Sequence, residues 1–314
     1  MTTTSTDPAG ADAPRAARLI DRGYRRYEGE RGGVRSAMRT VTTLTLQRAL
    51  GLRRPARAKV FPALAIVLAY LPTAVYVGIT VIGNRLEEQG APGDVIASQL
   101  IPTYASNYGQ VVLAIIVIAS FVAPEVLCPD RRTGMLGLYL ASPLTRTSYL
   151  LAKGLSVLIV VGIVTIGPPL LLLIGYSTQG YGPDGVAGWL GTFARIIGAG
   201  LAVSLLYTVL SLAISSITSR KAAASAAFLA VLVGTSGLVT YLVEDAGQSA
   251  RLGLVNLGTL PYEAVFRIFG EPSELTFSGE VELSTASVFV AYAAWVLAGL
   301  LVIAWRYRRL EVTR

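Results

Sequence analysis

Apolar residues recur along this chain in six long stretches, with polar or charged residues between them. Each stretch has about 20 residues or more, which is the length that a helix needs to cross the hydrocarbon core of a bilayer. The six stretches are residues 60–83, 108–127, 150–176, 190–217, 222–243 and 286–305. The pattern predicts an all-α polytopic membrane protein with six transmembrane helices.

The polar segments before the first stretch differ in character. Residues 1–32 are rich in Thr, Ala, Gly and Arg and predict a flexible cytoplasmic tail rather than a signal peptide. In residues 33–59, one helical face carries Val34, Met38, Val41 and Thr45. This segment predicts an N-terminal amphipathic helix that lies on the membrane surface; the alternative is a solvated helix with incidental apolar positions. The charged residues that lie off that face or follow the helix are Arg35, Arg39, Arg48, Arg53, Arg54, Arg57 and Lys59.

The six-span domain is expected over residues 60–306, followed by a cytoplasmic tail at 307–314. Its largest external segment, residues 244–285, contains an apolar piece at 252–269 that Pro261 interrupts. We expect short helices there, lying on or dipping into the outer leaflet. Residues 270–283 are acidic, with alternating apolar positions. They predict a small hairpin or a solvated loop.

The distribution of lysine and arginine sets the expected orientation. With a cytoplasmic N-terminus, 23 of the 27 basic residues lie inside and 4 outside, whereas 11 of the 19 acidic residues lie outside. Because basic residues concentrate in cytoplasmic segments, both termini are expected in the cytoplasm. The formal charge of +8 then orients the chain in a membrane, and no nucleic-acid partner is expected.

The composition excludes several kinds of chemistry. The chain has no histidine and a single cysteine, Cys128, which excludes a His/Cys zinc site, an intrachain disulfide and a nucleophile activated by histidine. None of Lys59, Lys153 and Lys221 is followed by Ser or Thr, so the Gly-Lys-Ser/Thr phosphate loop of ATPases is absent. We therefore expect no catalytic residue, metal or cofactor in this chain, and any ATP and magnesium would be bound by a partner.

The loop between the second and third stretches changes character three times. Asp130, Arg131 and Arg132 form a charged corner, Gly134 allows a turn, and residues 135–142 form a short, mostly apolar segment that ends at Pro143. This arrangement is typical of a docking element. The alternative is an ordinary interfacial loop whose arginines lie at the headgroups.

Residues 129–146 resemble the signature loop of type-2 ABC-transporter permeases. The corresponding parts are Asp130-Arg131, Gly134-Met135-Leu136, the leucine-rich residues 138–140, Ser142-Pro143-Leu144-Thr145-Arg146, and Lys153-Gly154. Two features depart from the family pattern, because Asp130 stands where Glu is commoner and Lys153 precedes Gly154 instead of following a glycine. The amphipathic entry helix, the six spans and the large last external loop extend the similarity over most of the chain.

The resemblance implies that residues 135–142 form a cytoplasmic coupling helix that inserts into a groove of a separate ATPase subunit. Apolar side chains would fill the groove, the arginines would pair with its acidic rim, and Pro143 would stop the helix. The expected coupling residues are Asp130, Arg131, Arg132, Gly134, Met135, Leu136, Leu138, Tyr139, Ser142 and Pro143. The resemblance also implies two ATPase subunits, a second permease subunit that is identical or related, and efflux across the bacterial inner membrane between the two permeases.

Two charged residues are candidates for a position within the membrane. Glu125, near the inner end of the second stretch, is either a functional acid or an interface residue paired with Arg131 or Arg132. Arg195, early in the fourth stretch, is expected to reach the outer headgroups rather than substrate. Small residues that favour close helix packing over a substrate path are Gly198, Gly200, Ser204, Ser211, Ser215 and Ser216.

Two other functions fit the same sequence. The first is a six-span transporter that works without ATP, although Glu125 is the only acid within the spans that could serve proton coupling. The second is a membrane scaffold or immunity protein that transports nothing.

Overall fold

The computed structural model describes residues 32–52, 55, 59–90, 100–271 and 283–309. Within these ranges the chain is helical and has no strand. The expected N-terminal tail, the basic residues Arg53, Arg54 and Arg57, most of the segment 270–283 and the end of the C-terminal tail lie outside the described residues. The helices are α1 (Val34–Ala49), α2 (Val60–Glu88), α4 (Asn107–Arg132), α5 (Leu136–Leu140), α6 (Arg146–Thr178), α7 (Gly185–Ile217), α8 (Lys221–Thr240), a π turn (Tyr241–Asp245), a 3₁₀ turn (Ala250–Val255), α9 (Leu260–Phe269) and α10 (Thr285–Arg308).

Six of these helices are long and apolar enough to cross a membrane, as the sequence predicted: α2, α4, α6, α7, the continuous segment Lys221–Asp245, and α10. The helices run beyond the expected ends, for example to Glu88 in α2 and back to Arg146 in α6. Polar residues form these extra turns, so hydropathy alone could not place the ends.

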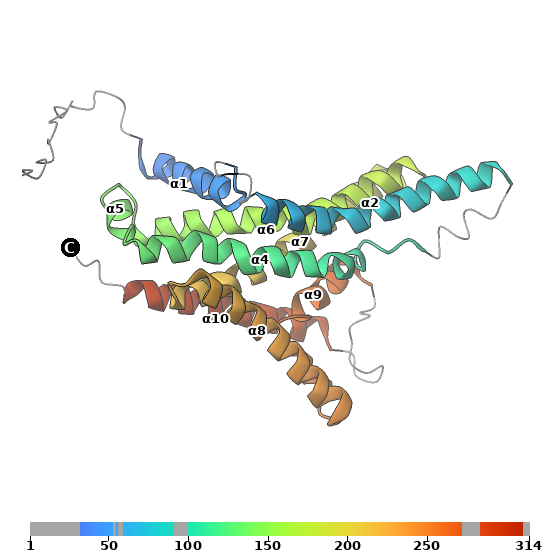
Figure 1. Cartoon of the computed structure of the whole chain (residues 1–314). Helices are drawn as coiled ribbons and strands as arrows, with labels where there is room; N and C mark the ends of the chain where they lie inside the picture. The colour runs from blue at the N-terminus through green and yellow to red at the C-terminus, as the bar shows by residue number, and fades with distance from the viewer. Residues whose placement is uncertain (1–31, 53–54, 56–58, 91–99, 272–282, 310–314) are drawn as a thin grey trace, which may run out of the picture. The chain divides into compact units, whose positions relative to one another are not determined.

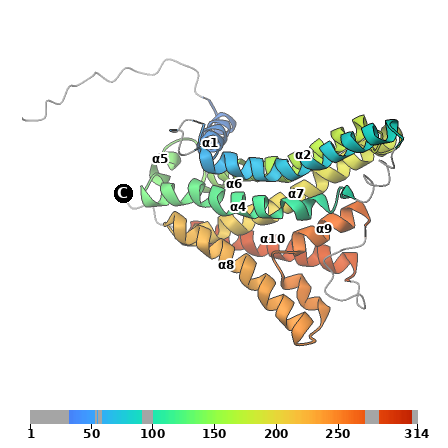
Figure 2. The ribbon, with the colours of Figure 1, turned by 45° about the vertical axis from the view of Figure 1, so that its right-hand side comes forward.

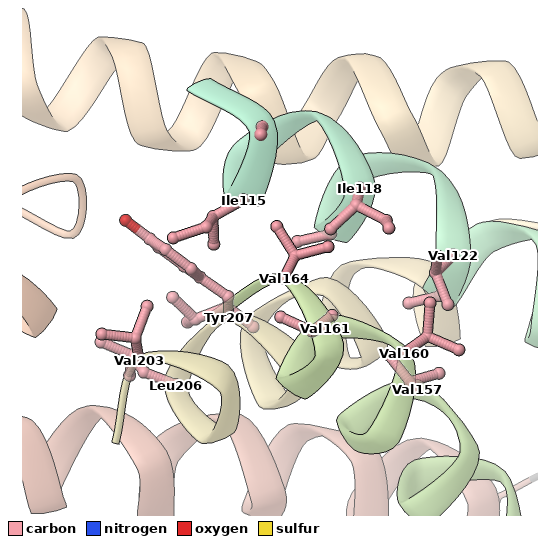
Figure 3. Packing of buried hydrophobic residues seen from close by; sticks show 14 of the residues in the cluster. Ile115, Ile118, Val122, Val157, Val160, Val161, Val164, Val203, Leu206 and Tyr207 are labelled. Atoms are coloured by element: carbon pink, nitrogen blue, oxygen red, sulfur yellow. The ribbon is translucent and has the colours of Figure 1, made fainter. Parts of the chain in front are cut away.

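The centre of the bundle is formed by α4, α6 and α7 (Figure 3). Ile115 and Ile118 of α4, Val161 and Val164 of α6, and Tyr207 of α7 are buried against one another there. Figures 1 and 2 show α2 alongside this centre and α8 running obliquely away from it. Most of the apolar surface of α2, α8 and α10 is exposed, which suits helices that face lipid or another membrane subunit.

Small residues bring α7 close to its neighbours at two points. A Cβ on Gly200 would lie 3.3 Å from the Thr165 carbonyl oxygen and would collide with Ile166. Ser211 is buried and donates a hydrogen bond to the Ala119 carbonyl of α4 at 2.8 Å. Close packing is therefore confirmed at these positions. Gly198 differs, because a Cβ there would meet nothing within 4 Å.

Helix α1 packs against the start of α6 (Figure 1). Val41 is buried in a cluster with Leu144 and Ala152, and Met38 packs beside it, whereas Val34 is 43% exposed. Ser156 of α6 donates a hydrogen bond to the Thr42 carbonyl at 3.1 Å. Met38, Val41 and Thr45 of the expected face are therefore used in packing within the protein. The amphipathic character of α1 stays a prediction. The position of α1 on a membrane surface stays a prediction.

The connection between α8 and α10 contains the short helices expected at 252–269, with one difference. Pro261 lies in the first turn of α9, where its missing N–H costs nothing and its fixed φ favours a helix; it begins a helix instead of breaking one. Almost all of α9 is buried, and Glu263 pairs with Arg267 at 3.1 Å. The helix ends at Gly270, whose φ of 74° is left-handed.

Two hydrogen-bonded contacts show which helix ends lie together at one end of the bundle. Arg131 at the end of α4 bonds the Thr218 carbonyl after α7, and Arg146 at the start of α6 bonds the Tyr307 carbonyl near the end of α10. These termini share one end, which we call the basic end. Its described basic residues include Arg48, Arg131, Arg132, Arg146, Lys153, Arg220, Lys221, Arg306, Arg308 and Arg309.

Candidate functional site

The loop between α4 and α6 folds into a turn followed by a short helix. Gly134 adopts φ 66°, a left-handed conformation that glycine tolerates best, and the Met135 N–H returns to the Asp130 carbonyl at 3.0 Å. The sequence predicted this turn. Helix α5 then spans Leu136–Leu140 and ends two residues before Ser142, which precedes Pro143.

The start of α6 fixes the other side of the loop. Thr145 caps this helix, since its hydroxyl accepts a hydrogen bond from the Ser148 N–H at 3.2 Å, and the Ser148 hydroxyl accepts one from the Thr145 N–H at 2.8 Å. Such a reciprocal cap satisfies two N–H groups that otherwise lack a partner in the first turn. The loop that carries α5 is therefore held between two well-defined helix ends.

The described apolar side chains on α5 and at its N-cap divide into two groups. Leu138 is 66% exposed and Met135 is 37% exposed, so both remain available for a partner. Tyr139 points the other way, with its ring 5.2 Å from the ring of Tyr149 and 5.4 Å from the ammonium of Lys153. Burial, assisted by the negative charge of Asp130, raises the pKa of Tyr139, so its hydroxyl stays neutral.

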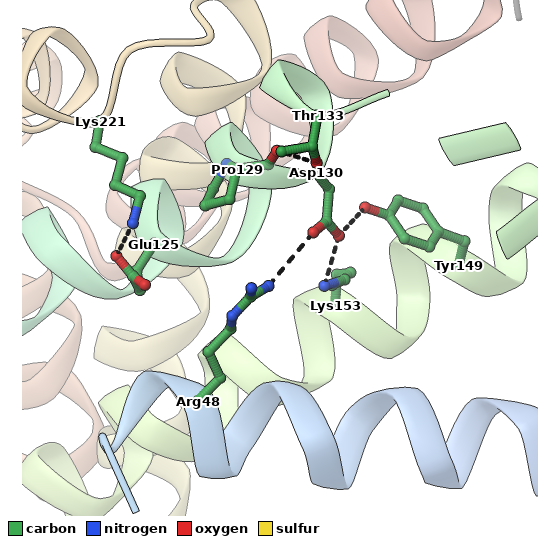
Figure 4. Close-up of polar contacts among 8 residues, drawn as sticks. All are labelled: Arg48, Glu125, Pro129, Asp130, Thr133, Tyr149, Lys153 and Lys221. Carbon is green, nitrogen blue, oxygen red and sulfur yellow. Dashed lines mark hydrogen bonds and ion pairs between the residues drawn. The ribbon is translucent and has the colours of Figure 1, made fainter. Parts of the chain in front are cut away.

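A charged cluster around the buried Asp130 and Lys153 joins the ends of the two helices that flank α5 (Figure 4). The Asp130 carboxylate contacts the Lys153 ammonium at 2.8 Å, accepts a hydrogen bond from the Tyr149 hydroxyl at 2.9 Å, and lies 3.6 Å from the Arg48 guanidinium. The side chains of Asp130 and Lys153 are only 3% and 2% exposed. Removing one member of such a pair leaves an uncompensated charge away from water. The cluster therefore joins α1, α4 and α6 next to α5, whose Tyr139 packs on Tyr149 and Lys153.

The sequence analysis named Asp130 as part of the charged corner and did not predict that Arg48, Tyr149 and Lys153 surround it. The sequence did contain one indication of the Asp130–Lys153 pair. Asp130 and Lys153 are opposite charges at the facing ends of two apolar helices joined by a short loop, and such a hairpin brings its two ends together. Arg48 gave no comparable signal, because its partner is far along the chain.

The two arginines of the charged corner have different surroundings. The Arg131 guanidinium donates hydrogen bonds to the Ser216 and Thr218 carbonyls at the end of α7, where cations suit the helix dipole. Arg132 is exposed. Of this pair, Arg132 is the residue whose guanidinium faces solvent.

The remaining candidate charges lie apart from the cluster. Glu125 forms an ion pair with Lys221 at the start of α8, and the two side chains are 21% and 46% exposed; the sequence hypothesis had named Arg131 or Arg132 as its partner. Arg195 is exposed on α7. Within the described ranges, no group of three His, Cys, Asp or Glu side chains is arranged to hold a metal ion.

A family model described as ABC-2 family transporter protein matches residues 57–312, more than four-fifths of the chain. The chain belongs to the ABC-2 transporter family. The matched segment contains all six spans, α5 and α9 of this ABC-2 protein, and it begins after α1. No curated protein matches the sequence.

Membership makes this ABC-2 protein a multi-pass membrane permease of an ABC transporter, a kind of subunit that associates with ABC ATPase subunits and is typically not itself catalytic. Arg48, which completes the cluster around Asp130, comes from outside the matched segment. The cluster thus joins the family domain to the helix that precedes it.

Proposed function

We propose that this permease forms the membrane path of an ABC exporter and is driven through α5 by separate ATP-binding-cassette subunits. The observation that carries the proposal is the pair of exposed apolar side chains at α5, Met135 at its N-cap and Leu138 within it, next to a buried ion pair. An exposed apolar side chain on a short, firmly based helix suits insertion into a groove of another protein. Arg132 beside it suits an acidic rim.

The cluster explains how docking at α5 moves the spans. Tyr139 packs on Tyr149 and Lys153, and Asp130 holds Lys153 from α4. A displacement of α5 therefore acts on the ends of α4 and α6 together rather than being absorbed by a loose loop. A rigid link of this kind is what alternating access requires, because ATP binding must shift the balance between two arrangements of the permease.

The rest of the assembly follows from this role. ATP and magnesium are bound by two partner ATPases, and a second permease, identical or related, completes the substrate path along the exposed faces of the bundle. The excess of basic residues at the α5 end supports a cytoplasmic position for that end and for both termini. A bacterial inner membrane as the location of the chain is part of the same proposal. The direction of transport is outward.

The pairing of Glu125 argues against an ATP-independent, proton-coupled carrier. Its carboxylate is held by Lys221, so it is not a lone acid of the kind that proton relays use. A scaffold or immunity protein would need no exposed apolar helix at the α4–α6 loop.

The test uses the double variant Met135→Asp/Leu138→Asp. The variant is purified from its native membranes, and the ATP hydrolysis that co-purifies with it is measured. Burying one such side chain contributes about 1.5–3 kcal/mol, and about 1.4 kcal/mol corresponds to tenfold in affinity. We expect ATPase retention and transport to fall at least tenfold, with insertion unchanged.

Val186→Asp is the matched control, because Val186 is an exposed apolar residue at the far end of α6 and α7. It should keep both activities. A loop variant that retains its ATPase and transports like the wild type overturns the proposal and leaves the ATP-independent carrier or the scaffold.

A further inference from the structure

The two halves of α6 are held by different helices. In the first half, the Thr42 hydroxyl of α1 donates a hydrogen bond to the Ala152 carbonyl at 3.3 Å. The next residue, Lys153, has its ammonium 2.8 Å from the Asp130 carboxylate of α4. The first half of α6 is therefore joined to α1 and to the cluster beside α5.

The second half of α6 is held by α2. A Cβ on Gly175 would collide with Val77 of α2, so the two backbones approach closely there. Further along, the Asn84 side-chain amide donates a hydrogen bond to the Gln179 carbonyl, directly after α6, at 2.9 Å. Tyr70, Val77 and Asn84 follow one another at intervals of seven residues and so lie on the same face of α2. This face accompanies the second half of α6 to its end.

Two adjacent prolines interrupt the backbone hydrogen bonds of α6 between these halves. Pro168 and Pro169 lie inside the helix and have no N–H, so the carbonyls four residues earlier, those of Val164 and Thr165, lack their usual helical donors. Val164 and Thr165 are both buried. Helices bend where such bonds are missing. Residues 162–169 are called the interrupted segment below.

Tyr70 of α2 contacts the interrupted segment directly. Its hydroxyl donates a hydrogen bond to the Ile163 carbonyl at 3.0 Å. A Cβ on Gly167 would collide with the same hydroxyl, so the missing side chain of Gly167 makes the space that the hydroxyl occupies. From α7, the Gly200 carbonyl accepts a hydrogen bond from the Thr165 hydroxyl at 3.0 Å. The segment with the fewest bonds of its own is thus braced by α2 and α7.

Free space adjoins the interrupted segment. A groove of about 520 Å³ lies between α2, α6 and α7, and its lining includes Tyr70, Gly162, Ile163, Ile166, Gly167 and Leu201. The lining is apolar apart from the Tyr70 hydroxyl, so no polar contact other than this brace has to break when α6 moves along the groove. Missing helical bonds, a brace and adjoining space therefore meet at one level of α6.

We propose that α6 bends at the interrupted segment during transport and that Tyr70 positions this bend. The inference rests on the proposed function, in which an ATPase displaces α5. That displacement reaches the first half of α6 through Lys153, whereas the second half stays with α2. Tyr70 acts through the Ile163 carbonyl of the α6 backbone, so it is a positioning residue.

The experiment measures the distance between spin labels on Leu151→Cys of α6 and Val67→Cys of α2 by pulsed electron paramagnetic resonance, in the full-length permease purified with its ATPase. Leu151 and Val67 are 65% and 56% exposed, and the native Cys128 is buried, so the label reaches the introduced cysteines. Leu151 lies about 20 Å from Val164 along the helix, and a turn of about 20° would displace it by about 7 Å. We expect the distance to shift by about 3–7 Å when ATP and vanadate trap the complex.

Proline variants test whether the interrupted segment permits this shift. Pro168→Ala/Pro169→Ala restores both N–H groups, so the shift should disappear while the ATPase stays bound. Pro124→Ala restores one N–H inside α4 and should keep the full shift. A full shift in the double variant, or no shift in the unaltered complex, would overturn the inference.

Tyrosine variants test the brace. Tyr70→Phe removes the hydrogen bond to α6 and keeps the ring, so the distance distribution without nucleotide should broaden. Tyr108→Phe removes a bond of the same kind between α4 and α7, 3.1 Å long to the Ile196 carbonyl. It should lower the melting temperature without broadening the distribution, and equal broadening in the two variants would contradict a positioning role for Tyr70.

The nucleotide-free permease separates this inference from the proposed function. If no ATPase co-purifies, the proposed function fails, and the bend is decided by the permease alone. Its distance distribution should then be broader than that of Pro168→Ala/Pro169→Ala, because the restored bonds stiffen α6. Equal widths would overturn the bend.

Discussion

The buried cluster around Asp130 supports a quantitative prediction about single and double substitutions. In Asp130→Asn the Lys153 ammonium, 2% exposed, loses its counter-ion, and Arg48 adds a second positive charge 3.6 Å from the same site. Breaking a buried pair in this way costs about 3–5 kcal/mol. We expect Asp130→Asn to lie near the upper value.

Lys153→Met should cost less than Asp130→Asn. The Asp130 carboxylate would still accept the Tyr149 hydrogen bond and would still face Arg48. A loss of about 3 kcal/mol is expected, at the lower end of the range for a broken buried pair. The double variant Asp130→Asn/Lys153→Met removes both charges of the closest pair, so its loss should be smaller than the sum of the two single losses.

The assay measures the apparent melting temperature of the detergent-solubilised protein. Samples are heated to a series of temperatures, and the protein that remains folded is quantified by size-exclusion chromatography. At roughly 2–4 °C per kcal/mol, Asp130→Asn should lower the melting temperature by about 10 °C or more. Glu125→Gln is the control, because its Lys221 partner is 46% exposed and exposed pairs contribute about 1 kcal/mol or less. Equal small shifts for Asp130→Asn and Glu125→Gln, or strict additivity in the double variant, would refute the reasoning.

Two further predictions concern packing and orientation. Gly200→Ala should destabilise the protein by about 1–3 kcal/mol because its Cβ collides with Ile166, whereas Gly198→Ala, which meets nothing within 4 Å, should be neutral or slightly stabilising; equal melting temperatures for the two would contradict this. Reporter fusions at Arg220, between α7 and α8, and after Arg309 should read cytoplasmic, because basic residues concentrate near both positions. A fusion at Gly182 should read external. An external signal at Arg220 would reverse the assigned orientation.

The sequence predicted the features that depend on local pattern. Hydropathy located six spans, and Gly134 and Pro143 bounded the segment in which α5 forms. Each of these signals is carried by residues close together in the chain. Pro261 shows the limit of such signals, since a proline can either break a helix or open one, and only the helix boundaries distinguish these cases.

The partners of the charged residues could not be predicted in the same way. Asp130 meets Arg48, Arg131 meets the end of α7, and Glu125 meets Lys221, and each contact joins segments far apart in the sequence. Tyr139 was expected to contact a partner, which stays a prediction, and its ring also packs on Tyr149. In so short a helix, the inward face is chosen by the elements beneath it rather than by any repeat in the sequence.

The central claim, that α5 is the surface on which an ATPase docks, is tested most directly by cross-linking from Leu138. The sole native cysteine, Cys128, is buried, so Leu138→Cys adds a reachable thiol that can carry a photo-reactive label in native membranes. We predict an adduct whose partner peptides come from a protein with a Gly-Lys-Ser/Thr phosphate loop, and no such adduct from Asp184→Cys in the connection between α6 and α7. Labelled Leu138→Cys that gives only lipid adducts, or the same adduct from both positions, would contradict the account.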